Sequence, residues 1–186
     1  MSTESDTRRE VEDRFIEVWG EISALWGVNK SVGRVQALLY LAGEPLDIET
    51  VGARLQISHG NTSTSIRDLM GWGVVSRVHK PGDRKQYFEA EQDPWTWFHT
   101  TIRERRRREV VPVMERLHAA AGFAEGFARA AKGPEKKELA DLHARMQRFD
   151  SFAHEFVDLI DAFLGLGHGR MGKFFRGMAR LLPRGK

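Results

Sequence analysis

Residues 47–72 read DIETVGARLQISHGNTSTSIRDLMGW and contain two short amphipathic segments with helical periodicity, separated by a brief connection. Asp47 can cap a first helix over residues 48–55, because its carboxylate accepts hydrogen bonds from the unpaired backbone N–H groups of a first turn. Ser58 can cap a second helix in the same way, and that helix continues to the end of the stretch. Two short helices joined by so tight a turn predict a helix-turn-helix.

The residues that follow change from a helical period to a period of two. Residues 74–79 alternate between the two faces of a strand, Pro81-Gly82-Asp83 turns the chain, and residues 86–89 form a second strand. The sequence therefore predicts a β-hairpin wing directly after the helix-turn-helix.

Long helical segments flank this unit. Residues 7–26 repeat apolar side chains along one helical face, and a second helical stretch runs from residue 93 to about residue 131. Pro112 lies inside the second stretch and lacks a backbone N–H group, so we expect a kink or a break near Val110 and Val111. The predicted fold class is mainly α with a small β-hairpin. The predicted architecture is a winged helix-turn-helix domain plus a long helical dimerisation arm.

The last long helix, after Gly133-Pro134, repeats apolar residues at strict 3-4 spacing over more than three heptads, which usually indicates a helical partner. We divide the chain into three regions: an N-terminal helix that contributes to a dimer interface (1–29), a winged helix-turn-helix domain (30–92) and a helical dimerisation region (93–186). The third region is also a candidate for sensing an effector. The residues expected in the dimer interface are apolar members of the first and last helices: Phe15, Val18, Ile22, Leu142, Met146, Phe149, Phe156, Ile160 and Phe163.

A helix that reads base edges in the major groove needs small or polar residues near its N-terminus, and residues 59–65 are six polar residues and one glycine. The hairpin tip adds three cations where a wing meets phosphates, with Arg84 suited to a narrow minor groove. A solvated helix start that caps itself would explain the same polar cluster without a ligand. The residues expected to contact double-stranded DNA are Ser58, His59, Asn61, Thr62, Ser63, Ser65, Arg67, Lys80, Arg84 and Lys85, with Asn61, Thr62 and Ser65 foremost.

Four motifs resemble the winged-helix pattern of the MarR family over about residues 30–92: LQIS at 55–58, IRDLM at 66–70, GVVSR at 73–77 and DR at 83–84. The order of the long helices resembles the GbsR branch of that family. The resemblance implies a bacterial transcription regulator, usually a repressor, that binds a near-palindromic operator as a homodimer and is released by a small ligand. An alternative is a winged-helix module that docks a protein partner instead of DNA.

Composition limits the other function classes. Within 186 residues there is no cysteine, which excludes disulfides, cysteine-based zinc sites and thiol redox sensing. The net charge of +3 permits nucleic-acid binding through local clusters of cations. The N-terminus lacks signal-peptide features and no apolar run is long enough for a membrane span, so we expect a cytoplasmic protein without membrane contact.

Three further residue groups have ordinary explanations that we favour. The arginine-rich run at 103–108 is better explained by a solvated helix face with Glu104–Arg108 and Arg105–Glu109 ion pairs than by DNA contact. Flanking charges of a helical interface explain the cluster Asp150, His154, Asp158 and Asp161 better than a divalent metal does. The five tryptophans could cage a quaternary ammonium ligand, but core and interface packing explains them at least as well.

No nucleophile, base and oxyanion set can be placed on the chain, so we expect no enzyme. We also expect no cofactor and no metal.

Overall fold

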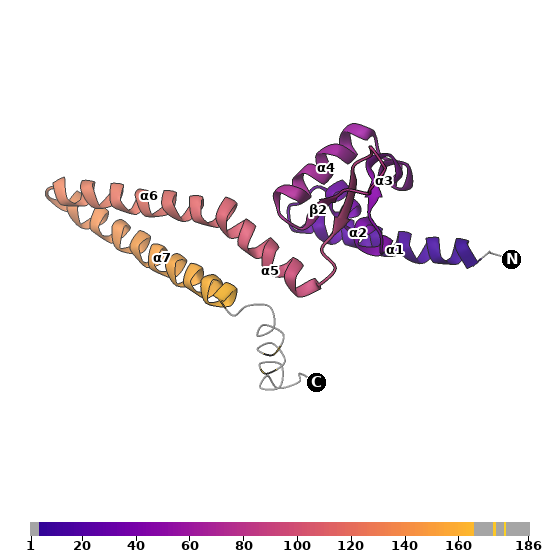
Figure 1. Cartoon of the computed structure of the whole chain (residues 1–186). Coiled ribbons are helices and arrows are strands. Elements are labelled where there is room, and N and C mark those ends of the chain that lie inside the picture. The colour runs from indigo at the N-terminus through magenta and orange to yellow at the C-terminus, as the bar shows by residue number, and fades with distance from the viewer. Residues whose placement is uncertain (1–3, 166–172, 174–176, 178–186) are drawn as a thin grey trace. The chain divides into compact units, whose positions relative to one another are not determined.

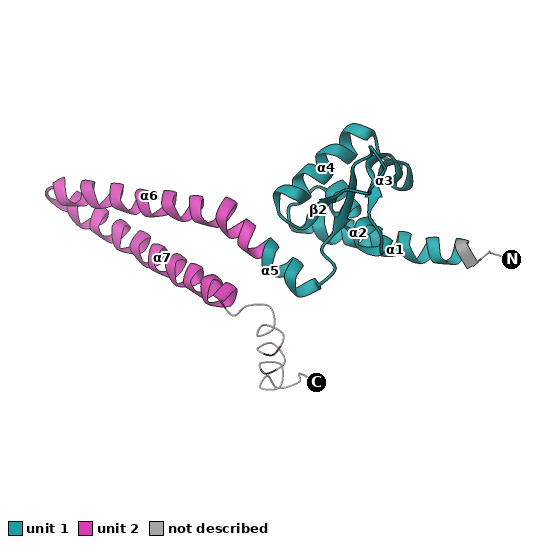
Figure 2. Ribbon diagram, in the orientation of Figure 1, with its two compact units in different colours: residues 1–101 teal, residues 102–186 magenta. Residues whose placement is uncertain are grey.

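The computed structural model describes residues 4–165, 173 and 177, and Figure 1 shows its elements along the chain. The chain divides into two compact units, Met1–Thr101 and Ile102–Lys186 (Figure 2). We call the first unit the head. The prediction of a mainly α fold with a small β element is confirmed, and the end of the region predicted to run to residue 186 lies outside the described residues.

The head begins with four helices: α1 (Glu4–Leu25), α2 (Lys30–Ala42), α3 (Ile48–Leu55) and α4 (His59–Gly71). Both predicted caps are confirmed. The Asp47 carboxylate accepts hydrogen bonds from the backbone N–H groups of Glu49 and Thr50, and the Ser58 hydroxyl accepts one from the N–H of Asn61. These caps fix where α3 and α4 start, and so fix the helix-turn-helix.

The turn between α3 and α4 depends on a left-handed residue and a glycine. Gln56 has a φ of 55°, and the backbone N–H of Ile57 donates to the carbonyl of Gly52 over 3.1 Å. A Cβ atom on Gly52 would lie 3.0 Å from Thr62 Oγ1 and 3.2 Å from the Ile57 carbonyl oxygen. Gly52 therefore lets α4 cross α3 at close range.

A three-stranded antiparallel sheet follows, with β1 (Leu46–Asp47), β2 (Val75–Val78) and β3 (Tyr87–Ala90) in the order β1-β3-β2. The pairing of β2 with β3 confirms the predicted hairpin. The pairing of β1 with β3 was not predicted, because a two-residue strand has no periodicity to detect.

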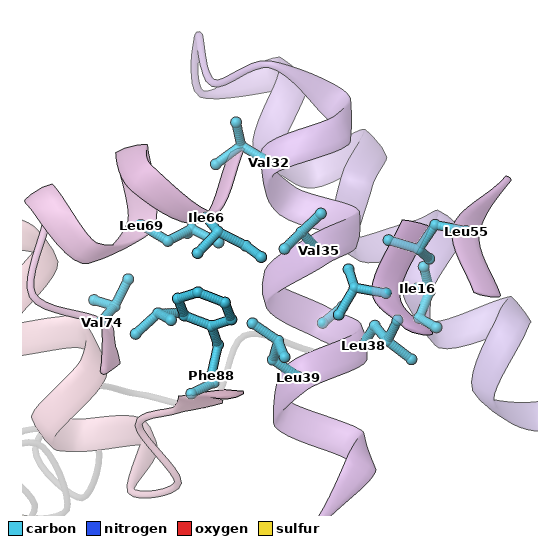
Figure 3. Close-up of a cluster of buried hydrophobic side chains, with 14 residues drawn as sticks. Ile16, Val32, Val35, Leu38, Leu39, Leu55, Ile66, Leu69, Val74 and Phe88 are labelled. Atoms are coloured by element: carbon cyan, nitrogen blue, oxygen red, sulfur yellow. The ribbon is translucent and has the colours of Figure 1, made fainter. Parts of the chain in front are cut away.

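The core of the head is built around α2 (Figure 3). Val35 and Leu39 of α2 pack among Ile66 and Leu69 of α4 and Phe88 of β3, and all five side chains are buried. Full burial of such a side chain stabilises a fold by about 1.5–3 kcal/mol. The core therefore joins α4 and the wing strand β3 to α2.

One face of α1 belongs to this core. Ile16 is buried, and a Cβ atom on Gly33 of α2 would lie 2.3 Å from the Ser23 hydroxyl oxygen, so the two helices pack with little space between them. Glu17 of α1 also forms ion pairs with Lys30 and Arg34 of α2, at 2.9 and 2.7 Å. Apolar side chains on another face of α1, among them Val18 and Ile22, remain exposed to solvent.

The chain then continues through α5 (Pro94–Arg105), the π-helical turn η1 (Arg106–Val110), α6 (Val111–Ala130) and α7 (Pro134–Gly165). The expected kink or break near Pro112 takes the form of this π turn, in which the Val111 N–H donates to the Arg106 carbonyl. The π turn shifts the hydrogen-bond register by one residue just before Pro112, the residue that supplies no N–H to a continuous helix. Within the second unit, α6 and α7 pack as a helical hairpin. No helix of the described residues is both long and apolar enough to cross a membrane.

Candidate nucleic-acid interface

One face of α4 is open to solvent and polar. His59 and Arg67 are exposed, and Ser63 is half-buried between them. These residues are four apart, so they line one side of the helix. All three were predicted to contact DNA, and the structure brings them to a common surface.

Thr62 and Ser65 lie on the opposite side of α4, and their predicted DNA contacts are wrong. Their side chains are 0% and 1% exposed. The Thr62 hydroxyl donates to the Ser58 carbonyl over 3.0 Å, and Thr62 also fills the space beside Gly52. Small polar side chains are needed here for close helix packing, and they have the same composition as a DNA-reading surface.

Asn61 is exposed, but its amide already has partners within the head. Its Nδ2 donates to Ser31 Oγ at the start of α2 over 3.1 Å, and its Oδ1 accepts from Ser65 Oγ over 3.4 Å. An amide held in this way is pre-oriented at the N-terminal end of α4. It retains one N–H and one lone pair for a further contact.

A groove of about 730 Å³ runs between α4 and the sheet. Its α4 side includes His59, Ser63 and Arg67, and its sheet side includes Arg77. Arg77 is exposed on β2 and was not predicted as a site residue. The signal that could have found it is its strand position, which places a cation on the wing beside the polar face of α4.

The tip of the wing is an ordered turn. Gly82 has a φ of +83°, which favours glycine, and the Asp83 N–H donates to the Lys80 carbonyl over 3.1 Å. The Tyr87 hydroxyl donates to Asp83 Oδ2 over 2.6 Å, and this bond lowers the pKa of Asp83 and raises the pKa of Tyr87. Lys80 Nζ lies 4.1 Å from the centre of the Tyr87 ring.

The three predicted wing cations therefore have different surroundings. Lys80 rests on an aromatic ring, and Lys85 forms ion pairs with Glu49 at 2.8 Å and Asp47 at 3.5 Å. The hydrogen bond to Glu49 raises the pKa of Lys85. Arg84 is exposed, and its guanidinium forms no ion pair among the described residues, so of the three cations its charge is the least occupied by other contacts.

The arginine-rich run has the ion pairs expected of a solvated helix. Glu104 pairs with Arg108 at 3.3 Å, and Arg105 pairs with Glu109 at 3.8 Å, as predicted. Arg106 pairs with Asp161 of α7. These contacts give Arg105, Arg106 and Arg108 carboxylate partners within the chain.

The sequence profile of the MarR family matches residues 26–86, which include α2, the helix-turn-helix, β2 and the tip of the wing. The head carries a MarR-like winged helix-turn-helix domain. The repressor GbsR of Bacillus subtilis, an HTH-type transcriptional repressor, is 30% identical over 98 residues, which are 53% of this chain and 54% of GbsR. YvaV of the same organism is 29% identical over 91 residues, or 49% of this chain and 51% of YvaV.

These matches span about half the length of each relative. A solved structure described as a transcriptional regulator covers 83% of this chain and 95% of its own, with a TM-score of 0.53 and 21% identity. Its likeness to this chain shows that the fold, including helices beyond the MarR-like domain, occurs in a known structure.

Proposed function

We propose that the chain is a sequence-specific transcription regulator, and in particular a repressor, that binds duplex DNA as a homodimer through its MarR-like heads. The observation that carries this proposal is the groove in which His59, Ser63 and Arg67 of α4 face Arg77 of the wing. In this proposal α4 lies in the major groove, and Arg84 reaches the neighbouring minor groove.

A near-palindromic operator follows from the dimer. Two heads related by a two-fold axis present the same α4 to two half-sites, which lie about one helical turn apart. Phosphate contacts from the wing supply affinity, and side chains of α4 supply the choice of bases.

Uncovered apolar surface supports the homodimer. On α1, Phe15, Val18 and Ile22 are 39%, 49% and 42% exposed, although Ile16 on the other face is buried. On α7, Leu142, Phe149 and Phe156 are 44%, 57% and 48% exposed. Met146, Ile160 and Phe163 are half-buried within the single chain, so we assign them a smaller share of the interface.

Release by a small ligand is proposed to act through a cavity of about 200 Å³ in the head. Phe15, Trp19 and Trp97 form one aromatic side, with Trp19 and Trp97 rings 5.2 Å apart and Phe15 stacked on Trp19 at 5.8 Å. Phe15 also belongs to the exposed face of α1. A ligand in this cavity would therefore alter a residue of the proposed dimer interface.

The experiment that tests the function is selection of bound sequences from random duplex DNA by the full chain at low salt. Enrichment of a motif with two inverted half-sites is expected. Uniform recovery of all sequences, or no DNA binding together with co-purification of a protein partner, would overturn the proposal.

A further inference from the structure

We propose a divalent transition-metal site of the zinc class between α6 and α7, formed by His118, Asp150 and His154. One potential ligand atom from each of these residues lies within 4.8 Å of the other two. Asp150 and His154 share a face of α7 because they are four residues apart, and His118 comes from α6. The inference does not depend on DNA binding.

Only one of the two carboxylate oxygens of Asp150 has a hydrogen-bond partner among the described residues. His118 Nδ1 lies 2.9 Å from Asp150 Oδ2. The second oxygen, Asp150 Oδ1, is buried and has no hydrogen-bond partner among the described residues, and its distance of 3.6 Å from His154 Nδ1 is too long for one. A buried carboxylate oxygen without a donor is costly, and a cation at this point would satisfy it.

The donors suit a borderline metal ion. Two imidazoles and a carboxylate are ligands of Zn²⁺, Co²⁺ and Ni²⁺, whereas Mg²⁺ and Ca²⁺ prefer oxygen alone. Both imidazole rings are mostly exposed, with 71% and 59% of the His118 and His154 side chains accessible. Water can therefore complete a tetrahedral set, as in three-ligand zinc sites.

Binding requires only a local rearrangement. The two rings are 5.8 Å apart, edge to face, and exposed imidazoles rotate easily toward a common point. The His154 Nδ1 position now faces the backbone carbonyl of Asp150 at 2.8 Å, so rotation of this ring exchanges that contact for the metal. A bound ion would join α6 to α7 at mid-helix and stabilise the hairpin.

The test uses the full chain and ZnCl₂, with calorimetric titration and thermal unfolding as readouts. We expect one Zn²⁺ per chain and a higher Tm, both lost or weakened at least tenfold in the His118→Gln/His154→Gln double variant. His79→Gln, which changes an exposed histidine of the head, is the matched control and should bind Zn²⁺ as the unmodified chain does. Circular dichroism checks that each variant is folded.

A second probe reports coordination directly. Co²⁺ added to the unmodified chain should give the visible absorption bands of a tetrahedral N/O site, and the double variant should not. Excess MgCl₂ should not displace the bound Co²⁺ from the unmodified chain. Equal Zn²⁺ affinity in the unmodified chain and the double variant, or no Zn²⁺ binding by the unmodified chain, overturns the proposal.

Discussion

Asn61 and Ser31 join the N-terminal end of α4 to the start of α2 through a hydrogen bond of 3.1 Å, from the Asn61 amide to the Ser31 hydroxyl. Asn61 is also the residue of α4 best suited to bidentate recognition of adenine. The Asn61→Ala variant should therefore lose about 1–3 kcal/mol of discrimination at one base pair of the operator. The measurement is the Kd for the operator and for its single-base variants.

Ser31→Ala is the matched control for that experiment, because it removes the partner within the head and leaves the amide in place. It should weaken binding to all sequences to a similar, small extent. An equal loss for Asn61→Ala on every sequence would show that the amide only positions α4.

Thr62 and Ser63 are neighbours with opposite surroundings, and they separate stability from DNA contact. Thr62→Val keeps the shape beside Gly52 but removes the hydroxyl that donates to Ser58, so the free energy of unfolding should fall by about 1 kcal/mol with base preference unchanged. Ser63→Ala should weaken DNA binding and leave unfolding unchanged, since Ser63 lines the groove. Denaturant unfolding and binding isotherms distinguish the two. A changed base preference in Thr62→Val would contradict the packing role.

The wing cations should differ in their effect on salt dependence. Arg84→Ala should reduce the slope of log Kd against log salt concentration by about one, the change expected for one lost phosphate contact. Lys85→Ala should change this slope less, because Lys85 is already paired with Glu49 and Asp47. Titrations at several salt concentrations measure both slopes, and equal changes for the two variants would refute the distinction.

Asp47 should make the stability of the head depend on pH. Burial favours its neutral form, but hydrogen bonds from Thr50 and Glu49 and the charge of Lys85 outweigh this, so its pKa is lowered. A lowered pKa stabilises the folded state at pH values above the ordinary aspartate pKa of about 4. This stabilisation is lost as the pH falls through the pKa of the folded state.

Asp47→Ala should accordingly cost about 1 kcal/mol near neutral pH, the usual value of a lost cap, and the difference from the unmodified chain should shrink at acid pH. Glu44→Ala removes an exposed carboxylate three residues before Asp47 and serves as the control. Urea unfolding as a function of pH measures the difference. A difference that stays constant down to strongly acid pH would contradict the role of the ionised carboxylate.

Much of the fold could be predicted from the sequence because its signals are local. Caps such as Asp47 and Ser58 and the turn at Gly82 act within a few residues, so they are visible in a short stretch. The inward position of Thr62 could not be predicted, since it depends on the approach of α3 at Gly52. A polar residue that packs and a polar residue that reads DNA look alike until the neighbouring helix is known.

The last helix shows the same limit. His143 and Ala153 are buried in the single chain, although Leu142 and Phe152 beside them are exposed. The 3-4 spacing of apolar residues does not say which of two adjacent stripes packs within the hairpin. The pattern of α7 also could not show that His118 of α6 lies beside Asp150 and His154, because that proximity depends on how the two helices pack.

The exposed stripe of α7 gives the sharpest test of the homodimer. Phe149→Glu/Phe156→Glu places two carboxylates on apolar surface that the proposed partner would cover, so desolvation of these charges should weaken self-association at least tenfold, or about 1.4 kcal/mol. Sedimentation equilibrium measures the dissociation constant. Gln147→Glu adds a charge at another exposed position of α7 and should leave it unchanged. A double variant that remains dimeric would exclude this face of α7 as the interface, whereas a monomeric variant that also loses cooperative operator binding would link the interface to repression.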